Sequence, residues 1–81
     1  MRITVHCLGP AQRWFGVDEL PLELPDTATV QTAIEQLLTL SPAYAETEPM
    51  LAYALDEQWA DRRTPLHEGA VLALIPPISA G

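Results

Sequence analysis

The amino-acid sequence predicts an α+β fold in which a mixed β-sheet carries one main helix packed on one face. Three segments support this prediction. Residues 2–8 alternate between apolar and polar side chains, as a half-buried strand does. Residues 29–40 repeat apolar side chains with the period of an amphipathic helix. Residues 70–75 are apolar throughout, which favours a strand near the centre of the sheet that is covered on both faces.

The predicted first strand places Ile3, Val5 and Cys7 on one buried face, because alternate residues of a strand point to the same side. A short segment between Pro10 and Gly16 follows it. Proline at a first helical position and glycine just past the last one are typical of helix ends. We therefore expect one or two helical turns between these two residues.

A second strand is predicted over residues 18–24, where leucines alternate with other residues. Leu20, Leu22 and Leu24 should face the core. Pro21 lies within this strand and has no backbone N–H to donate to a neighbouring strand. The second strand should therefore lie at an edge of the sheet.

The main helix is predicted to begin after Thr29, whose hydroxyl is placed to cap its first turn. Its apolar stripe follows the i, i+3, i+4, i+7, i+8 pattern and consists of Val30, Ala33, Ile34, Leu37 and Leu38. Ser41-Pro42 repeats the arrangement of a cap followed by proline, so a second, shorter helix is expected there. Residues 46–49 should end that helix.

The remaining segments complete the predicted sheet. A third strand is expected over residues 51–56 and a short fourth over 59–62, before a turn at 67–69. The strand at 70–75 ends at Pro76-Pro77, since neither proline can donate to a ladder. This order of a hairpin, a helix, further strands and a final buried strand fits a β-grasp fold if the last strand pairs in parallel with the first.

The chain divides into a β-grasp domain at residues 1–77 and a flexible C-terminal tail at 78–81. The tail reads Ile78-Ser79-Ala80-Gly81 and has no periodicity, so it should extend into solvent unless a partner holds it. Pro76 and Pro77 are interpreted as a stiff stem that aims the terminus outward.

Eleven acidic side chains and four arginines give the 81 residues a formal net charge of -7. A field of this sign repels phosphate backbones and anionic lipid headgroups, so neither nucleic acid nor a membrane surface is expected as a partner. A basic protein partner is the natural complement. No apolar run approaches the ~20 residues that a membrane span needs.

Cys7 is the only cysteine, which leaves no internal disulfide, metal knuckle or CxxC redox pair. We therefore predict no metal site, and the reducing cytoplasm is the compartment that fits best. The sequence also contains no Ser, His and Asp constellation that suggests catalysis, so the chain is not expected to be an enzyme on its own.

Five further residues admit two interpretations each. His6 lies on the outward face of the first strand and, without an acidic or cysteine companion at useful spacing, is favoured as an ordinary surface histidine over a ligand or base. Arg62 and Arg63 are favoured as a solvated turn over a partner contact. Of Trp14 and Phe15, we expect one to pack against the sheet and the other to contact a partner.

Four stretches resemble the small subunits of molybdopterin synthase, which belong to the ubiquitin-like sulfur-carrier proteins. These stretches are Ala11-Gln12-Arg13 to Gly16, Thr29-Val30, Pro65-Leu66 to Gly69, and Leu74-Ile75-Pro76-Pro77-Ile78-Ser79-Ala80-Gly81. The resemblance runs the full length of the chain, and the last stretch is its specific motif. It implies the β-grasp fold. Family members usually end in Gly-Gly and usually follow the turn glycine with Asp, whereas this chain has Ala80-Gly81 and Gly69-Ala70.

The resemblance also implies a chemistry for Gly81. Its terminal carboxylate would be adenylated by a ubiquitin-activating-like adenylyltransferase that uses ATP and Mg, and a sulfur donor enzyme would then leave a thiocarboxylate. The chain itself would bind no cofactor. The segment inserted into the partner would consist of Pro76, Pro77, Ile78, Ser79 and Ala80. The large synthase subunit would hold cyclic pyranopterin monophosphate, to which the tail delivers sulfur for molybdenum cofactor biosynthesis.

Two alternatives stay open at this point. The chain could carry sulfur for another pathway, such as thiamin or amino-acid sulfur assembly, in which case it would bind a different acceptor protein. It could instead be a non-reactive β-grasp interaction module, for which the missing penultimate glycine is the positive hint.

Overall fold

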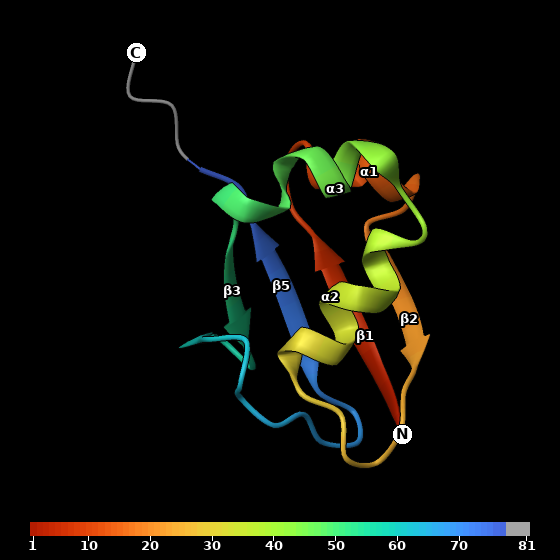
Figure 1. Ribbon diagram of the computed structural model, residues 1–81, viewed down its shortest axis with the longest axis vertical. Helices are drawn as coiled ribbons and strands as arrows, with labels where there is room; N and C mark the ends of the chain where they lie inside the picture. Colours follow the sequence, from red (N-terminus) through yellow and green to blue (C-terminus); the bar gives the residue numbers. More distant parts are fainter. Residues whose placement is uncertain (78–81) are drawn as a thin grey trace.

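The computed structural model describes residues 1–77, which form a five-stranded mixed sheet with helices packed on one face (Figure 1). The strands follow the order β2-β1-β5-β3-β4 across the sheet. Their bounds are β1 Arg2–Cys7, β2 Glu19–Glu23, β3 Ala52–Leu55, β4 Gln58–Ala60 and β5 Val71–Ile75. The helical segments are α1 Ala11–Phe15, α2 Val30–Leu38, α3 Pro42–Thr47 and the 3₁₀ turn η1 Glu48–Met50.

The central strand β5 determines the topology. It pairs in parallel with β1, where Val5 lies opposite Leu72, and antiparallel with β3, where Tyr53 lies opposite Leu74. A parallel neighbour requires a crossover connection, and α2 lies over the sheet within that connection (Figure 1). The predicted β-grasp fold is confirmed.

The N-terminal half follows the sequence pattern closely. Ile3, Val5 and Cys7 are buried, as the alternation predicted. β2 lies at the edge of the sheet, and Pro21 pairs with Thr4 from that edge position. The short helix α1 ends at Gly16, whose φ of 76° is a left-handed conformation that favours glycine.

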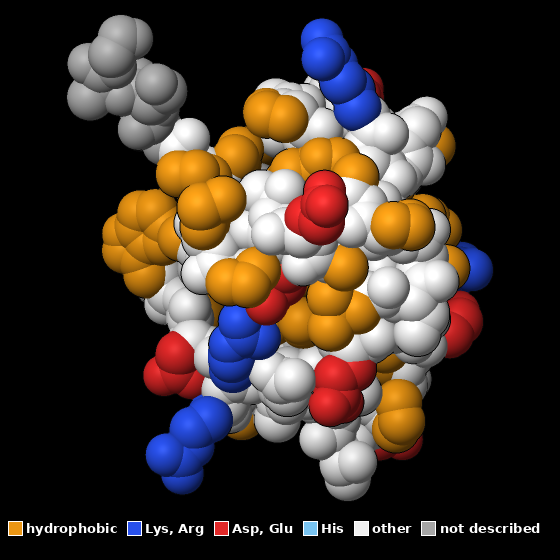
Figure 2. Space-filling view, turned by 45° about the horizontal axis from the view of Figure 1, so that its top comes forward, with side chains coloured by type: hydrophobic (Ala, Val, Ile, Leu, Met, Phe, Trp, Pro, Cys, Tyr) orange, Lys and Arg blue, Asp and Glu red, His pale blue; other side chains and the backbone are white. Residues whose placement is uncertain are grey.

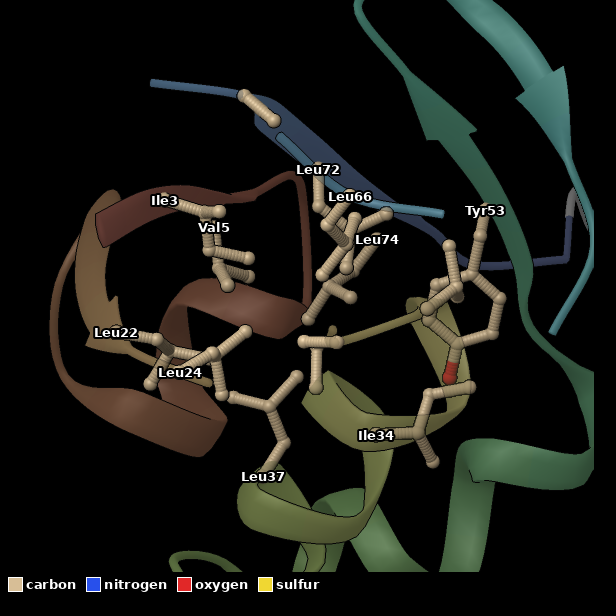
Figure 3. Packing of buried hydrophobic residues seen from close by; sticks show 14 of the residues in the cluster. Ile3, Val5, Leu22, Leu24, Ile34, Leu37, Tyr53, Leu66, Leu72 and Leu74 are labelled. Atoms are coloured by element: carbon tan, nitrogen blue, oxygen red, sulfur yellow. The ribbon is translucent and has the colours of Figure 1, made fainter. Parts of the chain in front are cut away.

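The main helix begins and packs as predicted but ends earlier. Thr29 caps α2 in a capping box in which its backbone N–H donates to the Thr32 hydroxyl at 3.0 Å. The buried face of α2 consists of Val30, Ala33, Ile34 and Leu37, and Figure 3 shows Ile34 and Leu37 among the buried side chains of the sheet. Leu38 is 37% exposed, contrary to the stripe, because α2 ends there and the chain turns at Thr39.

The C-terminal strands differ in detail from the sequence prediction. The fourth strand covers residues 58–60 in place of 59–62. It is joined to β3 by the turn Asp56-Glu57, in which both residues have positive φ, 49° and 70°. Such hairpin turns favour asparagine and glycine, and neither residue occurs here, so the composition of the turn gave no signal for its geometry.

One prediction about β5 is wrong. Its uninterrupted apolar sequence suggested a strand covered on both faces, yet only Leu72 and Leu74 are buried. Val71, Ala73 and Ile75 point to the other face and are half-exposed, because the helices of the described chain all lie on the Leu72 and Leu74 side (Figure 1). We refer to the uncovered side of the sheet as the open face.

Within residues 1–77, no helix combines the length and the apolar character needed to cross a membrane.

A side-chain clip holds the β3–β4 turn to the start of β5. The Asp56 carboxylate accepts a hydrogen bond from the Val71 N–H at 2.9 Å, and its other oxygen lies 2.5 Å from Nε2 of His67. The Val71 N–H, followed by His67, lowers the pKa of Asp56. The Asp56 carboxylate, followed by the Glu68 carbonyl, raises the pKa of His67 above its usual 6.5.

This clip predicts a pH dependence of stability. A histidine whose pKa is raised by folding stabilises the fold fully below its unfolded pKa, and the contribution is lost as pH rises through the folded pKa. The free energy of unfolding should therefore decline as pH rises from about 6 through the range above 6.5. The decline should be modest, because the His67 and Asp56 side chains are exposed. Urea unfolding of the wild-type chain and His67→Gln across this range tests it. Parallel pH curves for the two proteins would contradict the prediction.

Candidate functional site

The end of β5 marks the point where the chain leaves the sheet. Ile75, its last residue, lies opposite Ala52 of β3, and β1 lies on the other side. Pro76 is half-buried beside the β1–α1 turn, where a Cβ added to Gly9 would lie 4.0 Å from Cγ of Pro76. Pro77 is exposed. The chain therefore leaves from the middle of the sheet's end, and the function of this proline pair as a stem stays a prediction.

The predicted reactive residues continue from this point. Ile78, Ser79, Ala80 and Gly81 lie outside the residues that the structure describes. Their predicted function is therefore argued from the sequence, and the geometry of the site is that of its described surroundings.

The open face carries an apolar patch next to the end of β5. Directly opposite residues of neighbouring strands share a face, so Trp59 and Ala73, which both lie opposite Ala54, belong to the same side of the sheet. Trp59 is 75% exposed. We define the open-face patch as Ala52, Ala54, Trp59, Val71, Ala73 and Ile75.

The other half of the open face is polar. Arg2 pairs with Glu23 at 3.0 Å, and His6 lies 3.6 Å from Glu19. This outcome agrees with the interpretation of His6 as a surface histidine. The open face is therefore polar over strands β1–β2 and apolar over strands β5–β3–β4. Figure 2 views the molecule from the helical side and shows hydrophobic side chains at the edge where β3 and β4 lie.

Beneath the patch, a buried chain of hydrogen bonds connects α3, β3 and η1. The Tyr53 hydroxyl donates to the Glu48 carboxylate at 2.9 Å and lies 2.6 Å from the Tyr44 hydroxyl. The Tyr53 hydroxyl has one proton and donates it to Glu48, so the Tyr44 hydroxyl is the donor in the bond between the two tyrosines. Burial is the main cause that raises the pKa of Tyr44 to about 12 and the pKa of Tyr53 far above its usual range, so both stay neutral at physiological pH.

Arg62 extends this hydrogen-bond chain to the surface. Its guanidinium donates to Glu48 at 2.5 Å and to the Gln31 side chain at 3.1 Å. Arg62 nevertheless lies in an exposed turn, as interpreted, with 46% of its side chain exposed. Its spacing from Glu48 and Gln31 in the sequence gave no indication of the contact. Arg63 is exposed as well and makes no such side-chain contact among the described residues.

Three other candidates have structural explanations. Cys7 is buried, and burial, followed by the charge of Asp18, raises the pKa of its thiol, which makes it a poor nucleophile. Trp14 and Phe15 both pack against Tyr44, with ring centroids 5.9 and 5.5 Å away. The expectation that only one of these two aromatic residues packs is therefore wrong. Among residues 1–77, no three His, Cys, Asp or Glu side chains gather as a metal site requires.

Comparison with known proteins relates this geometry to a family. Residues 5–81 match the model of the ThiS family. The chain belongs to the ThiS family. A molybdopterin synthase sulfur carrier subunit of Arabidopsis thaliana is 30% identical over 81 residues, which make up all of this chain and 84% of that protein. The match includes the residues that follow Pro77.

Two solved structures resemble this ThiS-family chain in fold. SAMP1 from Haloferax volcanii has a TM-score of 0.87 and 19% identity, with all of both chains covered. A chain in the complex of subunits 1 and 2 of molybdopterin-converting factor from Helicobacter pylori has a TM-score of 0.72 and 23% identity, again over all of both chains. At these identities the likeness establishes the fold.

Sequence reasoning missed the open-face patch of this ThiS-family chain. The sequence predicts a short strand at Trp59 but not the face on which its side chain lies, and it predicts that β5 is covered on both faces. The informative signal is the combination of an exposed tryptophan in an edge strand with a central strand that does not alternate. A sheet with one helical layer leaves such side chains uncovered.

The buried hydrogen-bond chain predicts an unequal effect of two matching substitutions. Tyr53→Phe leaves the Tyr44 hydroxyl without an acceptor and should lower the free energy of unfolding by about 1–3 kcal/mol. Tyr44→Phe removes only the end of the chain of bonds and should cost about 0.5–1.5 kcal/mol. Urea denaturation measures both variants. A larger loss for Tyr44→Phe than for Tyr53→Phe would show that the order of donors is different.

Proposed function

We propose that this chain is the sulfur-carrier subunit of a molybdopterin synthase and donates sulfur from a C-terminal thiocarboxylate on Gly81. The observation that carries the proposal is the relationship over the whole chain to the Arabidopsis sulfur carrier subunit. The position of β5 supports it, because the strand ends beside an exposed apolar patch and is followed by two prolines and four further residues. On this proposal the chain works in the cytoplasm and is not an enzyme by itself.

The chemistry needs an activated terminus, since a carboxylate with a pKa of ~3.3–3.7 is ionised and a poor acyl electrophile. A ubiquitin-activating-like adenylyltransferase would join the Gly81 carboxylate to the α-phosphorus of ATP, with Mg, and release pyrophosphate. A sulfide equivalent from the sulfur donor enzyme would then displace AMP and leave the thiocarboxylate. Gly81 has no side chain, which suits insertion of the terminus into a narrow active site.

The large subunit of the synthase would supply the active site. In the Helicobacter pylori complex, subunit 1 of molybdopterin-converting factor assembles with subunit 2. We extend that arrangement to this chain. The large subunit would hold cyclic pyranopterin monophosphate. The sulfur anion would attack one of its carbons and form a C–S bond while a C–O bond to that carbon breaks, so the oxygen leaves with the electron pair. Hydrolysis of the resulting thioester would leave sulfur on the substrate and return the Gly81 carboxylate.

The open-face patch is the docking surface that we assign to this partner. Exposed apolar patches bordered by polar residues mark interaction sites, and tryptophan is enriched among residues that dominate binding energy. The patch also includes Ile75, the last residue of β5. A partner seated there would receive the C-terminal residues as they leave the sheet.

The thiocarboxylate predicts a mass change that depends on the last residue. After co-expression with the adenylyltransferase and the sulfur donor enzyme, the intact mass should rise by the exchange of one oxygen for one sulfur. Deletion of Gly81 should abolish the gain, whereas Ser79→Ala, a matched change within the same tail, should retain it. A chain that never gains sulfur under these conditions, or gains it without Gly81, excludes the proposed chemistry.

The docking surface predicts a second outcome. Trp59→Ala should weaken binding to the large subunit by about 2 kcal/mol or more, because a tryptophan that becomes buried in an interface contributes strongly. Leu40→Ala is the control, since Leu40 is also exposed, at 54%, but follows α2 on the helical side. Isothermal titration calorimetry compares the two variants. Equal affinities for Trp59→Ala and Leu40→Ala would place the interface elsewhere.

A further inference from the structure

The sheet has a step at the edge where β4 ends. β4 stops at Ala60, opposite Tyr53, whereas β3 continues back to Ala52. The chain turns away at Asp61, whose carboxylate accepts the Arg63 backbone N–H at 2.7 Å. This leaves a hollow of about 580 Å³ beside the end of β3, which we call the edge notch.

The edge notch combines apolar walls with two guanidinium groups. Trp59, Leu51 and Ala60 contribute apolar surface, and Arg62 and Arg63 lie along the same hollow. Asp61 also lines it, with its carboxylate bound to the Arg63 backbone N–H. Trp59 also belongs to the open-face patch, so the two surfaces are continuous. In Figure 2, arginine side chains lie below the hydrophobic group on this side of the molecule.

The two arginines differ in what already binds them. Arg62 is held in place by Glu48 and Gln31, so its position is set by the buried hydrogen-bond chain. Arg63 is bound to Asp61 only through its backbone N–H, and among residues 1–77 no carboxylate lies within ion-pair distance of its guanidinium. The guanidinium of Arg63 is therefore available to a partner.

The charge distribution favours an acidic ligand for this position. The chain has a net charge of -7 and only four basic side chains, of which two line the edge notch. Of the other two, Arg2 is already paired with Glu23, and Arg13 belongs to α1. A guanidinium presents planar donors that match a carboxylate in a bidentate arrangement.

We propose that the edge notch receives an apolar side chain of the large subunit together with an adjacent Asp or Glu side chain, and that Arg63 selects this partner by pairing with the carboxylate. This inference rests on the proposed function. The pairing determines how the partner sits on the open face, because Arg2, on the other half of this face, is already paired with Glu23. An incorrectly rotated partner would bring its carboxylate against acidic strands.

The test compares two charge reversals that change the net charge equally. The full chain and the purified large subunit are titrated by calorimetry for wild type, Arg63→Glu, Arg63→Lys and Arg13→Glu. Arg13 is likewise exposed but belongs to α1. Arg63→Glu should weaken binding about tenfold or more, since an attractive contact becomes a like-charge contact. Arg13→Glu should change the affinity by less than about threefold, as distant exposed charges are screened. Arg63→Lys should stay closer to wild type than Arg63→Glu.

A charge swap then identifies the partner group. Each interface Asp or Glu of the large subunit is replaced by Arg, and one such replacement should restore the affinity of Arg63→Glu while it weakens that of the wild type. Equal losses for Arg63→Glu and Arg13→Glu, or the absence of any restoring replacement, would overturn the inference and leave the sulfur-carrier proposal intact. No binding by the wild-type chain would instead remove the large subunit as the partner, and the inference with it.

Discussion

The parallel pairing of β1 with β5 is the constraint on which the rest of the structure depends. It brings the last strand to the centre of the sheet, between β1 and β3. A parallel neighbour can be reached only through a long crossover, and this chain uses that crossover for its main helix. The 77 described residues supply one helical layer, and this layer covers one face. A strand with apolar residues on both sides is therefore half-exposed at the middle of the open face.

The buried tyrosines connect this exposed surface to the core. Tyr53 faces the core from the same strand that presents Ala52 and Ala54 to the open face. Its hydroxyl donates to Glu48, and the same carboxylate accepts from the Arg62 guanidinium, so a buried group positions a side chain at the surface. Buried polar groups of this kind need every partner, because an unsatisfied group costs more than a satisfied bond contributes. The network therefore maintains the shape of the edge notch as well as the packing of α3.

The sequence predicted those features that depend on neighbouring residues. Alternation in β1, Pro21 at an edge and Thr29 at the start of α2 all express local rules, and each is confirmed. The features that failed depend on what lies across space. An apolar run such as residues 70–75 looks the same whether one face or both are covered, and the contact from Arg62 to Glu48 joins segments 14 residues apart. The reactive role proposed for the last four residues rests on a motif, because four residues without periodicity carry no folding signal.

Strand β3 contacts both the proposed docking surface and the end of β5. Ala52 lines the edge notch on one side and lies opposite Ile75 on the other. Neighbouring strands are ~4.8 Å apart, so the notch and the end of β5 are separated by about two strand spacings, ~10 Å. Four residues beyond Pro77 can span at most about 14 Å. The two distances are comparable. On the proposed function, a partner bound at the notch would therefore place its active site within about 14 Å of Pro77. Because β3 pairs directly with β5, the hydrogen bonds of the sheet set the spacing between the proposed docking surface and the end of β5.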